Sequence, residues 1–132
     1  MPQLPKPDQV LLQSMTKAQT LVKEAQSVRS DKQAFALTLW KAAAESEYAA
    51  FRIAVALGYE DYQSPDIDED PQGDQLEVAE ELLKEAEKSL SQKPQQSYAS
   101  VRKTVAILRK MYGAEEKGTK EDVPEPVDSP EQ

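Results

Sequence analysis

The fold is decided by the stretch FALTLWKAAAESEYAAFRIAVALGYEDY, residues 35–62. It holds six of the eight aromatic residues and is the most apolar part of the chain. Placed on a helix at 100° per residue, its apolar side chains cover well over half of the circumference. They are Phe35, Leu39, Ala43, Ala50, Ile53, Ala54 and Leu57 on one broad face, with Trp40, Ala44, Phe51 and Val55 beside them. Such a helix packs against neighbours on several sides, so we expect it to be the central helix of a bundle.

One acidic residue, Glu47, interrupts the apolar arc between Trp40 and Phe51. A carboxylate on an apolar face is costly unless it is paired. We therefore expect an ion pair with Arg102 or Arg109, or a hydrogen bond to a tyrosine. The alternative is that Glu47 belongs to a partner-facing patch together with Trp40 and Phe51.

Helical periodicity is also present in the residues that precede this stretch. An apolar stripe predicts a first helix over about 8–28. Ser30 and Gln33 have the spacing of a capping box and predict the start of a second helix. Gly58 is the expected C-terminal cap of that helix. Because no Gly or Pro separates the two segments, a single bent helix over 8–57 is the alternative.

Two more helices are predicted after an acidic segment. The third covers about 75–91 and is expected to be capped by Asp74 and Glu77. The fourth begins at Pro94, which suits a first helical turn, and is expected to stop at Gly113. The chain therefore predicts an all-α antiparallel four-helix bundle, or three helices if the first two form one long bent helix.

The domain organisation follows from these elements. Residues 1–7 form a Pro-rich lead-in, and 8–113 form the helical bundle domain with an acidic loop over 59–74. Residues 114–132 are acidic, contain several prolines and have few large apolar side chains, so we expect a disordered acidic C-terminal tail.

Composition excludes several kinds of chemistry. The chain has no Cys and no His, which removes disulfides, thiol nucleophiles, imidazole or thiolate metal sites and histidine acid–base catalysis. No apolar run is long enough to span a membrane, and no apolar leader is present. We expect a soluble cytoplasmic protein that is not an enzyme, has no cofactor and makes no membrane contact.

The acidic loop has the register of a calcium-binding loop at several positions. Oxygen ligands of this kind suit a hard cation. However, Pro71 occupies the position where the turn requires a glycine. A flexible acidic linker is therefore the preferred interpretation, with no metal bound. The ligand-like residues are Asp66, Asp68, Asp70, Asp74 and Glu77.

The fourth helix carries basic residues but no acid between Lys93 and Gly113, in a chain of net charge −8. Two basic pairs are one heptad apart and predict a basic helix face. Such a face suits a phosphate backbone or an acidic protein partner. It also suits contact with the acidic third helix or tail of the same chain, or with solvent. The four residues are Arg102, Lys103, Arg109 and Lys110.

Two functional hypotheses remain. In the first, the chain is a non-enzymatic interaction or assembly subunit that docks onto a protein partner or a multi-subunit complex. In the second, it is an accessory subunit of a ribonucleoprotein or DNA-bound complex and contacts nucleic acid through its last helix. The second hypothesis is based on the basic face of that helix. In its size, its all-α architecture and its basic residues, the chain is also similar to the helical small subunits of CRISPR effector complexes, which is an analogy of architecture and charge only.

Overall fold

A computed structural model describes residues 9–63, 65 and 75–122, with side chains up to residue 114. The described part contains four α-helices and no strand. The prediction of an all-α four-helix bundle is therefore confirmed. The helices are α1 (Gln9–Ser27), α2 (Lys32–Leu57), α3 (Leu76–Ser89) and α4 (Pro94–Asp122).

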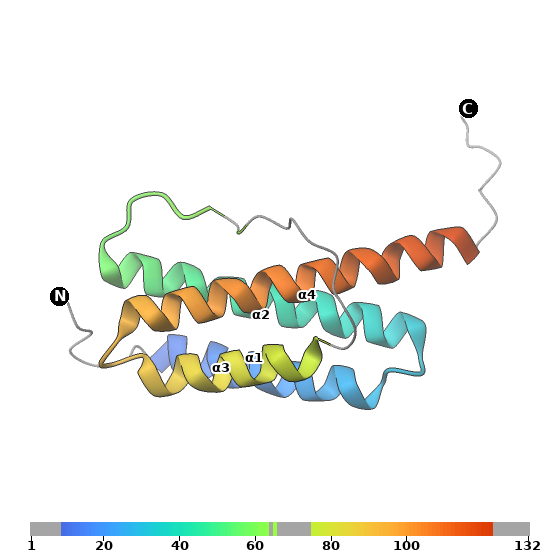
Figure 1. Cartoon of the computed structure of the whole chain (residues 1–132), viewed down its shortest axis with the longest axis horizontal. Helices are drawn as coiled ribbons and strands as arrows, with labels where there is room; N and C mark the ends of the chain where they lie inside the picture. The colour runs from blue at the N-terminus through green and yellow to red at the C-terminus, as the bar shows by residue number, and fades with distance from the viewer. Residues whose placement is uncertain (1–8, 64, 66–74, 123–132) are drawn as a thin grey trace.

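The four helices form a closed ring of antiparallel neighbours (Figure 1). α1 packs on α2 and α3, and α4 packs on the same two helices. Within the described residues the diagonal pairs, α1 with α4 and α2 with α3, make no comparable contact. α2 ends at the end of the bundle where α4 begins, whereas α3 begins at the opposite end (Figure 1). The α2–α3 connection therefore joins opposite ends of the bundle.

A turn separates α1 from α2, so the alternative of one bent helix is wrong. Asp31 is the N-cap of α2, with extended backbone angles of φ −101° and ψ 104°. Its Oδ1 accepts a hydrogen bond from the amide of Ala34 at 3.1 Å. This bond satisfies an amide that would otherwise lack a helical partner. The cap lies one residue after Ser30, the residue that the capping-box pattern had indicated.

The two glycines that were expected to end helices behave differently. Gly58 has φ 81°, and its amide bonds to the Val55 carbonyl at 3.1 Å, so it ends α2 as predicted. Gly113 does not have a positive φ, and α4 continues to Asp122. The prediction that α4 stops at Gly113 is therefore wrong. Glycine lowers helix stability but ends a helix only where the backbone turns left-handed.

Two further expectations concern the N-cap of α3 and the segment after Gly113. Gln75 is the N-cap of α3 and makes no side-chain capping bond, while Asp74 lies outside the described residues. Residues 114–122, the first part of the segment expected to be disordered, continue α4. Residues 1–8 and 123–132 also lie outside the described part.

The core consists of two clusters, one toward each end of the bundle, and every helix contributes to both. Alanines supply most of the buried apolar residues of α2, so neighbouring backbones approach closely. The first cluster comprises Ala18, Leu21, Val22, Ala25, Phe35, Leu39, Ala42, Ala43, Leu76, Ala79, Leu83, Leu108 and Met111. The second comprises Leu11, Met15, Ala49, Ala50, Ile53, Ala86, Leu90 and Val101.

Among the described helices α2 has two neighbours, α1 and α4, which leaves part of its apolar circumference uncovered. Trp40, Phe51 and Val55 are exposed by 55%, 45% and 59%. The expectation that these residues widen the packed face of α2 is therefore wrong. Among the described helices, none combines the length and apolar character needed to cross a membrane.

Replacing Ser46 by alanine is expected to raise the free energy of unfolding by about 1 kcal/mol. Ser46 is fully buried in α2, and among the described residues its Oγ has no hydrogen-bond partner. Removing an unsatisfied buried hydroxyl removes a desolvation cost. Urea denaturation of both proteins measures the difference.

Ser97 provides the matched control for this substitution. Its side chain is equally buried, but its Oγ donates a hydrogen bond to the Ala86 carbonyl at 2.7 Å. Ser97→Ala is therefore expected to destabilise the protein by about 1 kcal/mol. A loss of stability in Ser46→Ala would contradict the assignment of an unsatisfied hydroxyl.

Candidate interaction surface

An apolar stripe runs along the outer face of α2, and we call it the α2 stripe. Its members follow one another at intervals of three or four residues, so they lie on one side of the helix. All are exposed, and each of the five large side chains is between 42% and 59% exposed. Large apolar side chains gathered on one exposed face are typical of interaction sites. The stripe consists of Leu37, Trp40, Ala44, Tyr48, Phe51 and Val55.

A hollow of about 380 Å³ lies beside the N-terminal half of the α2 stripe, between α2 and α4. The rings of Trp40 and Tyr112 line it, together with two small α2 residues, Ala43 and Ala44. Glu47 and Arg109 supply its charged groups. A volume of this size can receive one large apolar side chain of a partner. The remaining helical stripe supplies the surrounding contact area.

Glu47 is held by one residue of α4 and one of the segment after α2. Its Oε1 lies 3.5 Å from Nη2 of Arg109, and its Oε2 accepts a hydrogen bond from the Tyr62 hydroxyl at 3.2 Å. The side chain of Glu47 is 21% exposed and that of Arg109 is 43% exposed. Both kinds of partner anticipated for Glu47 are thus present, and the ion pair forms one wall of the hollow next to Trp40.

An aromatic cluster fixes the segment after α2 onto α2 and α4. The rings of Tyr59 and Tyr62 contact Tyr98 of α4, with centroids 5.3 and 6.5 Å apart, and Tyr62 also meets Phe51 edge-on at 6.2 Å. The guanidinium of Arg102 lies over Tyr62 and Tyr98, at 5.5 and 5.4 Å from the ring centroids. These contacts build a continuous surface from the C-terminal half of the α2 stripe to α4.

The roles of Tyr62 and Tyr98 were not anticipated from the sequence. One local signal was available for Tyr98, because Tyr98 and Arg102 are four residues apart and therefore adjacent on a helix. The Arg102 Nη1 donates to the Tyr98 hydroxyl at 3.3 Å and to the Gln63 carbonyl at 2.6 Å. The position of Tyr62 depends on the path of the chain after Gly58, which no local pattern specifies.

Above pH 10, Tyr62→Phe is expected to make the stability of the protein less dependent on pH. Burial, followed by the nearby Glu47 carboxylate, raises the pKa of Tyr62 above its ordinary value. The folded chain therefore retains the phenolic proton in a pH range where the unfolded chain loses it. The contribution of Tyr62 is complete below about pH 10 and is lost as the pH rises further.

Urea denaturation at several alkaline pH values measures this effect. Tyr48→Phe is the matched control, because Tyr48 is exposed on the α2 stripe and its replacement removes the same phenolic group. Identical alkaline profiles for Tyr62→Phe and the wild-type protein would contradict the prediction.

The basic residues of α4 do not all point in the same direction, because Arg102 and Arg109 contact other parts of the chain. Arg102 and Arg109 turn toward the segment after α2 and toward Glu47, respectively. Lys103 is exposed, and Lys110 is partly buried. The four residues therefore do not present one uninterrupted row of outward charges.

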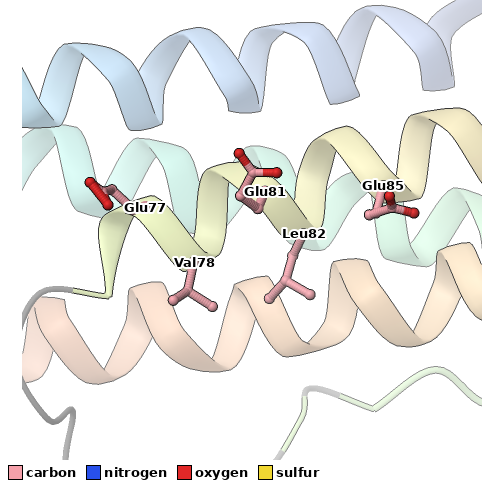
Figure 2. Close-up of a pocket in the computed structure, with 5 residues that line it drawn as sticks. All are labelled: Glu77, Val78, Glu81, Leu82 and Glu85. Carbon is pink, nitrogen blue, oxygen red and sulfur yellow. The ribbon is translucent and has the colours of Figure 1, made fainter.

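Two acidic residues of α3, Glu80 and Glu87, contact α1. Glu80 lies 3.8 Å from Lys23 of α1, and Glu87 accepts a hydrogen bond from Gln19 of α1 at 2.8 Å. Other acids border an open groove on α3, where Val78 and Leu82 point away from Glu81 (Figure 2). The residues drawn there are Glu77, Val78, Glu81, Leu82 and Glu85. This groove has far less exposed apolar side chain than the α2 stripe.

Of the five candidate calcium ligands, the structure describes only Glu77. Asp66, Asp68, Asp70 and Asp74 lie outside the described part, and Glu77 is an exposed residue in the first turn of α3. Across residues 9–63, 65 and 75–114, no three acidic side chains are grouped so that they could hold a metal ion.

Comparison with known proteins gives no match to a family model, a curated protein or a solved structure. The class of the protein is given by its fold and surface alone: it is an antiparallel four-helix bundle with an exposed aromatic stripe on α2.

Proposed function

We propose that the protein is a non-enzymatic interaction subunit that docks onto a protein partner through the α2 stripe. The observation that carries this proposal is the exposure of Trp40, Tyr48 and Phe51 on one side of α2. Tryptophan and tyrosine side chains supply much of the binding energy at protein interfaces. Placing three exposed aromatic rings on one regular helix exposes apolar surface to water, which a partner would cover.

The hollow beside Trp40 supports the same proposal. Hot-spot side chains dock into pockets near the centre of an interface, and this hollow adjoins the stripe. The ion pair of Glu47 with Arg109 and the Arg102 contacts hold the surrounding side chains in place. A surface that is organised before binding loses less conformational entropy when the partner arrives.

Co-purification from cells that produce the protein tests this proposal. Wild-type protein is compared with Trp40→Gln/Phe51→Gln, and the double variant is expected to lose the proteins that the wild type retains. Val78→Gln is the control, because Val78 is exposed by 41% on α3, away from α2. Circular dichroism melting establishes that each variant is folded.

Two results would contradict the proposal. One is retention of the same proteins by Trp40→Gln/Phe51→Gln. The other is their release when the extract is treated with nuclease, which would favour the nucleic-acid alternative based on Arg102, Lys103, Arg109 and Lys110. That alternative has weaker support, because Arg102 and Arg109 already bind groups of the same chain.

A further inference from the structure

We infer that the partner covering the α2 stripe is a second copy of the chain, with the two α2 helices antiparallel and each Phe51 ring over the hollow beside Trp40 of the other copy. This inference rests on the proposed function and names its partner. It is supported by the spacing of the stripe, by the position of the hollow and by the charges that flank the stripe.

Four apolar positions of the stripe have the same spacing when α2 is read in either direction. They follow one another at intervals of four, seven and four residues: Trp40, Ala44, Phe51 and Val55. A two-fold axis that crosses α2 midway between Ala44 and Phe51 therefore places these two residues opposite each other in the two copies. The same axis places Trp40 opposite Val55. A helix face that pairs with itself in the antiparallel sense requires this symmetry of spacing.

The hollow and the Phe51 ring lie on the same side of the stripe. Glu47 faces α4, because it pairs with Arg109, and Phe51 follows Glu47 by four residues, so both lie toward α4. The hollow is also between α2 and α4, with Ala44 as part of its lining. Two-fold pairing keeps this side of one copy beside the same side of the other, so each ring meets a hollow. Large and small side chains that face each other across an interface interlock closely.

The charges of α2 that flank the stripe cancel. They are two bases and two acids, Lys41, Arg52, Glu45 and Glu47. The net charge of −8 therefore comes from other parts of the chain. A flank without net charge selects neither a basic nor an acidic partner, and it allows two copies of an acidic chain to approach each other at this face.

The antiparallel register sets both signs of charge against each other along one edge. Glu45 lies 3.7 Å from Lys17 of α1, and Lys41 and Arg52 lie on the same side of α2, four residues before and seven after it. In this register Arg52 of the second copy is level with residue 43, between Lys41 and Glu45. It meets one like and one opposite charge, so the apolar contacts determine the association.

The exposed area sets the expected strength of the dimer. An aromatic side chain has a surface of 150–250 Å², so each half-exposed ring offers on the order of 100 Å². The stripes of two copies together then bury on the order of 1,000 Å², which is near the lower limit of specific interfaces. We expect a dissociation constant in the micromolar range.

Sedimentation equilibrium of the full-length protein from about 1 µM to 1 mM tests the inference. A reversible monomer–dimer equilibrium is expected. Trp40 is the only tryptophan, so its fluorescence should shift to shorter wavelength over the same concentration range as the ring leaves water. Phe51→Gln is expected to raise the dissociation constant roughly tenfold or more. Val78→Gln, on the exposed surface of α3, should leave it unchanged.

Single-cysteine variants test the register, because the chain contains no cysteine of its own. Tyr48 lies next to the two-fold axis, so Tyr48→Cys is expected to form a disulfide-linked dimer on mild oxidation. Leu37→Cys is the matched control, since Leu37 is also exposed on the stripe. In the antiparallel register the two Leu37 positions are separated by 21 residues, about 30 Å along the helices, and cannot be linked.

Three results would overturn the inference. They are a monomer throughout the concentration range, a dimer that Phe51→Gln leaves intact, and equal disulfide linkage of Leu37→Cys and Tyr48→Cys, which would indicate parallel pairing. If the protein is monomeric while Trp40→Gln/Phe51→Gln still loses its co-purifying proteins, only the second-copy inference is rejected, and docking onto a different protein stands.

Discussion

Leu39→Ala is expected to lower the free energy of unfolding by about 3 kcal/mol. Leu39 is fully buried in α2 and belongs to the core cluster that also contains Phe35, Leu83 and Leu108. Its truncation removes apolar contacts and leaves a cavity between helices that can close only in part. Because small domains are stable by only about 5–15 kcal/mol, this loss should lower the urea midpoint markedly.

Leu37 is the matched control, two residues earlier in the same helix. It is 52% exposed on the α2 stripe, so the same chemical change should alter stability by less than about 0.5 kcal/mol. The two substitutions have nearly the same effect on helix propensity, which isolates burial as the cause of the difference. Equal losses of stability in the two variants would contradict the assignment of Leu39 to the core and Leu37 to the surface.

Ala50→Leu is expected to lower the free energy of unfolding by about 2 kcal/mol. Ala50 is fully buried in the second core cluster, together with Ile53, Leu90 and Val101. A larger side chain at this point forces the helices apart or drives neighbouring side chains out of their preferred rotamers. Thermal and urea denaturation measure the loss.

Ala44→Leu is the corresponding surface control. Ala44 is exposed on the α2 stripe, beside the hollow lined by Trp40 and Tyr112. The added side chain meets no core atoms, so the stability should change by less than about 0.5 kcal/mol. A large loss of stability in Ala44→Leu would show that this side of α2 is packed in the folded protein.

The periodicity of α2 predicted its helix, but not which part of its apolar arc is covered. The expected central place is wrong, because α2 has two neighbours among the described helices, as does each of the others. Phe35 and Trp40 both lie on that arc, yet Phe35 is 3% exposed and Trp40 is 55% exposed. The covered part depends on how many helices surround α2 and at what angle, which are properties of the assembled bundle. Glu47 was the informative residue, because its charge marks the edge of the packed face.

The ends of the helices could also be predicted only in part from the sequence. Gly58 and Gly113 are equally plausible stops in the sequence, but only Gly58 has a left-handed backbone. Tyr62 was assigned to a loop by composition, although its ring packs against Tyr98 and its hydroxyl bonds to Glu47. For Tyr62, contacts with residues distant in sequence determine its position, and local propensity does not contain them.

The link between opposite ends of the bundle has a consequence for how the chain folds. α1 with α2, and α3 with α4, are hairpins whose contacts are local in sequence, and such contacts form fast. The α2–α4 and α1–α3 contacts join one hairpin to the other, so they form only when the two halves dock. The entropy of closing the long connection opposes that single step. Shortening the connection would therefore change the docking rate while leaving each hairpin able to form alone.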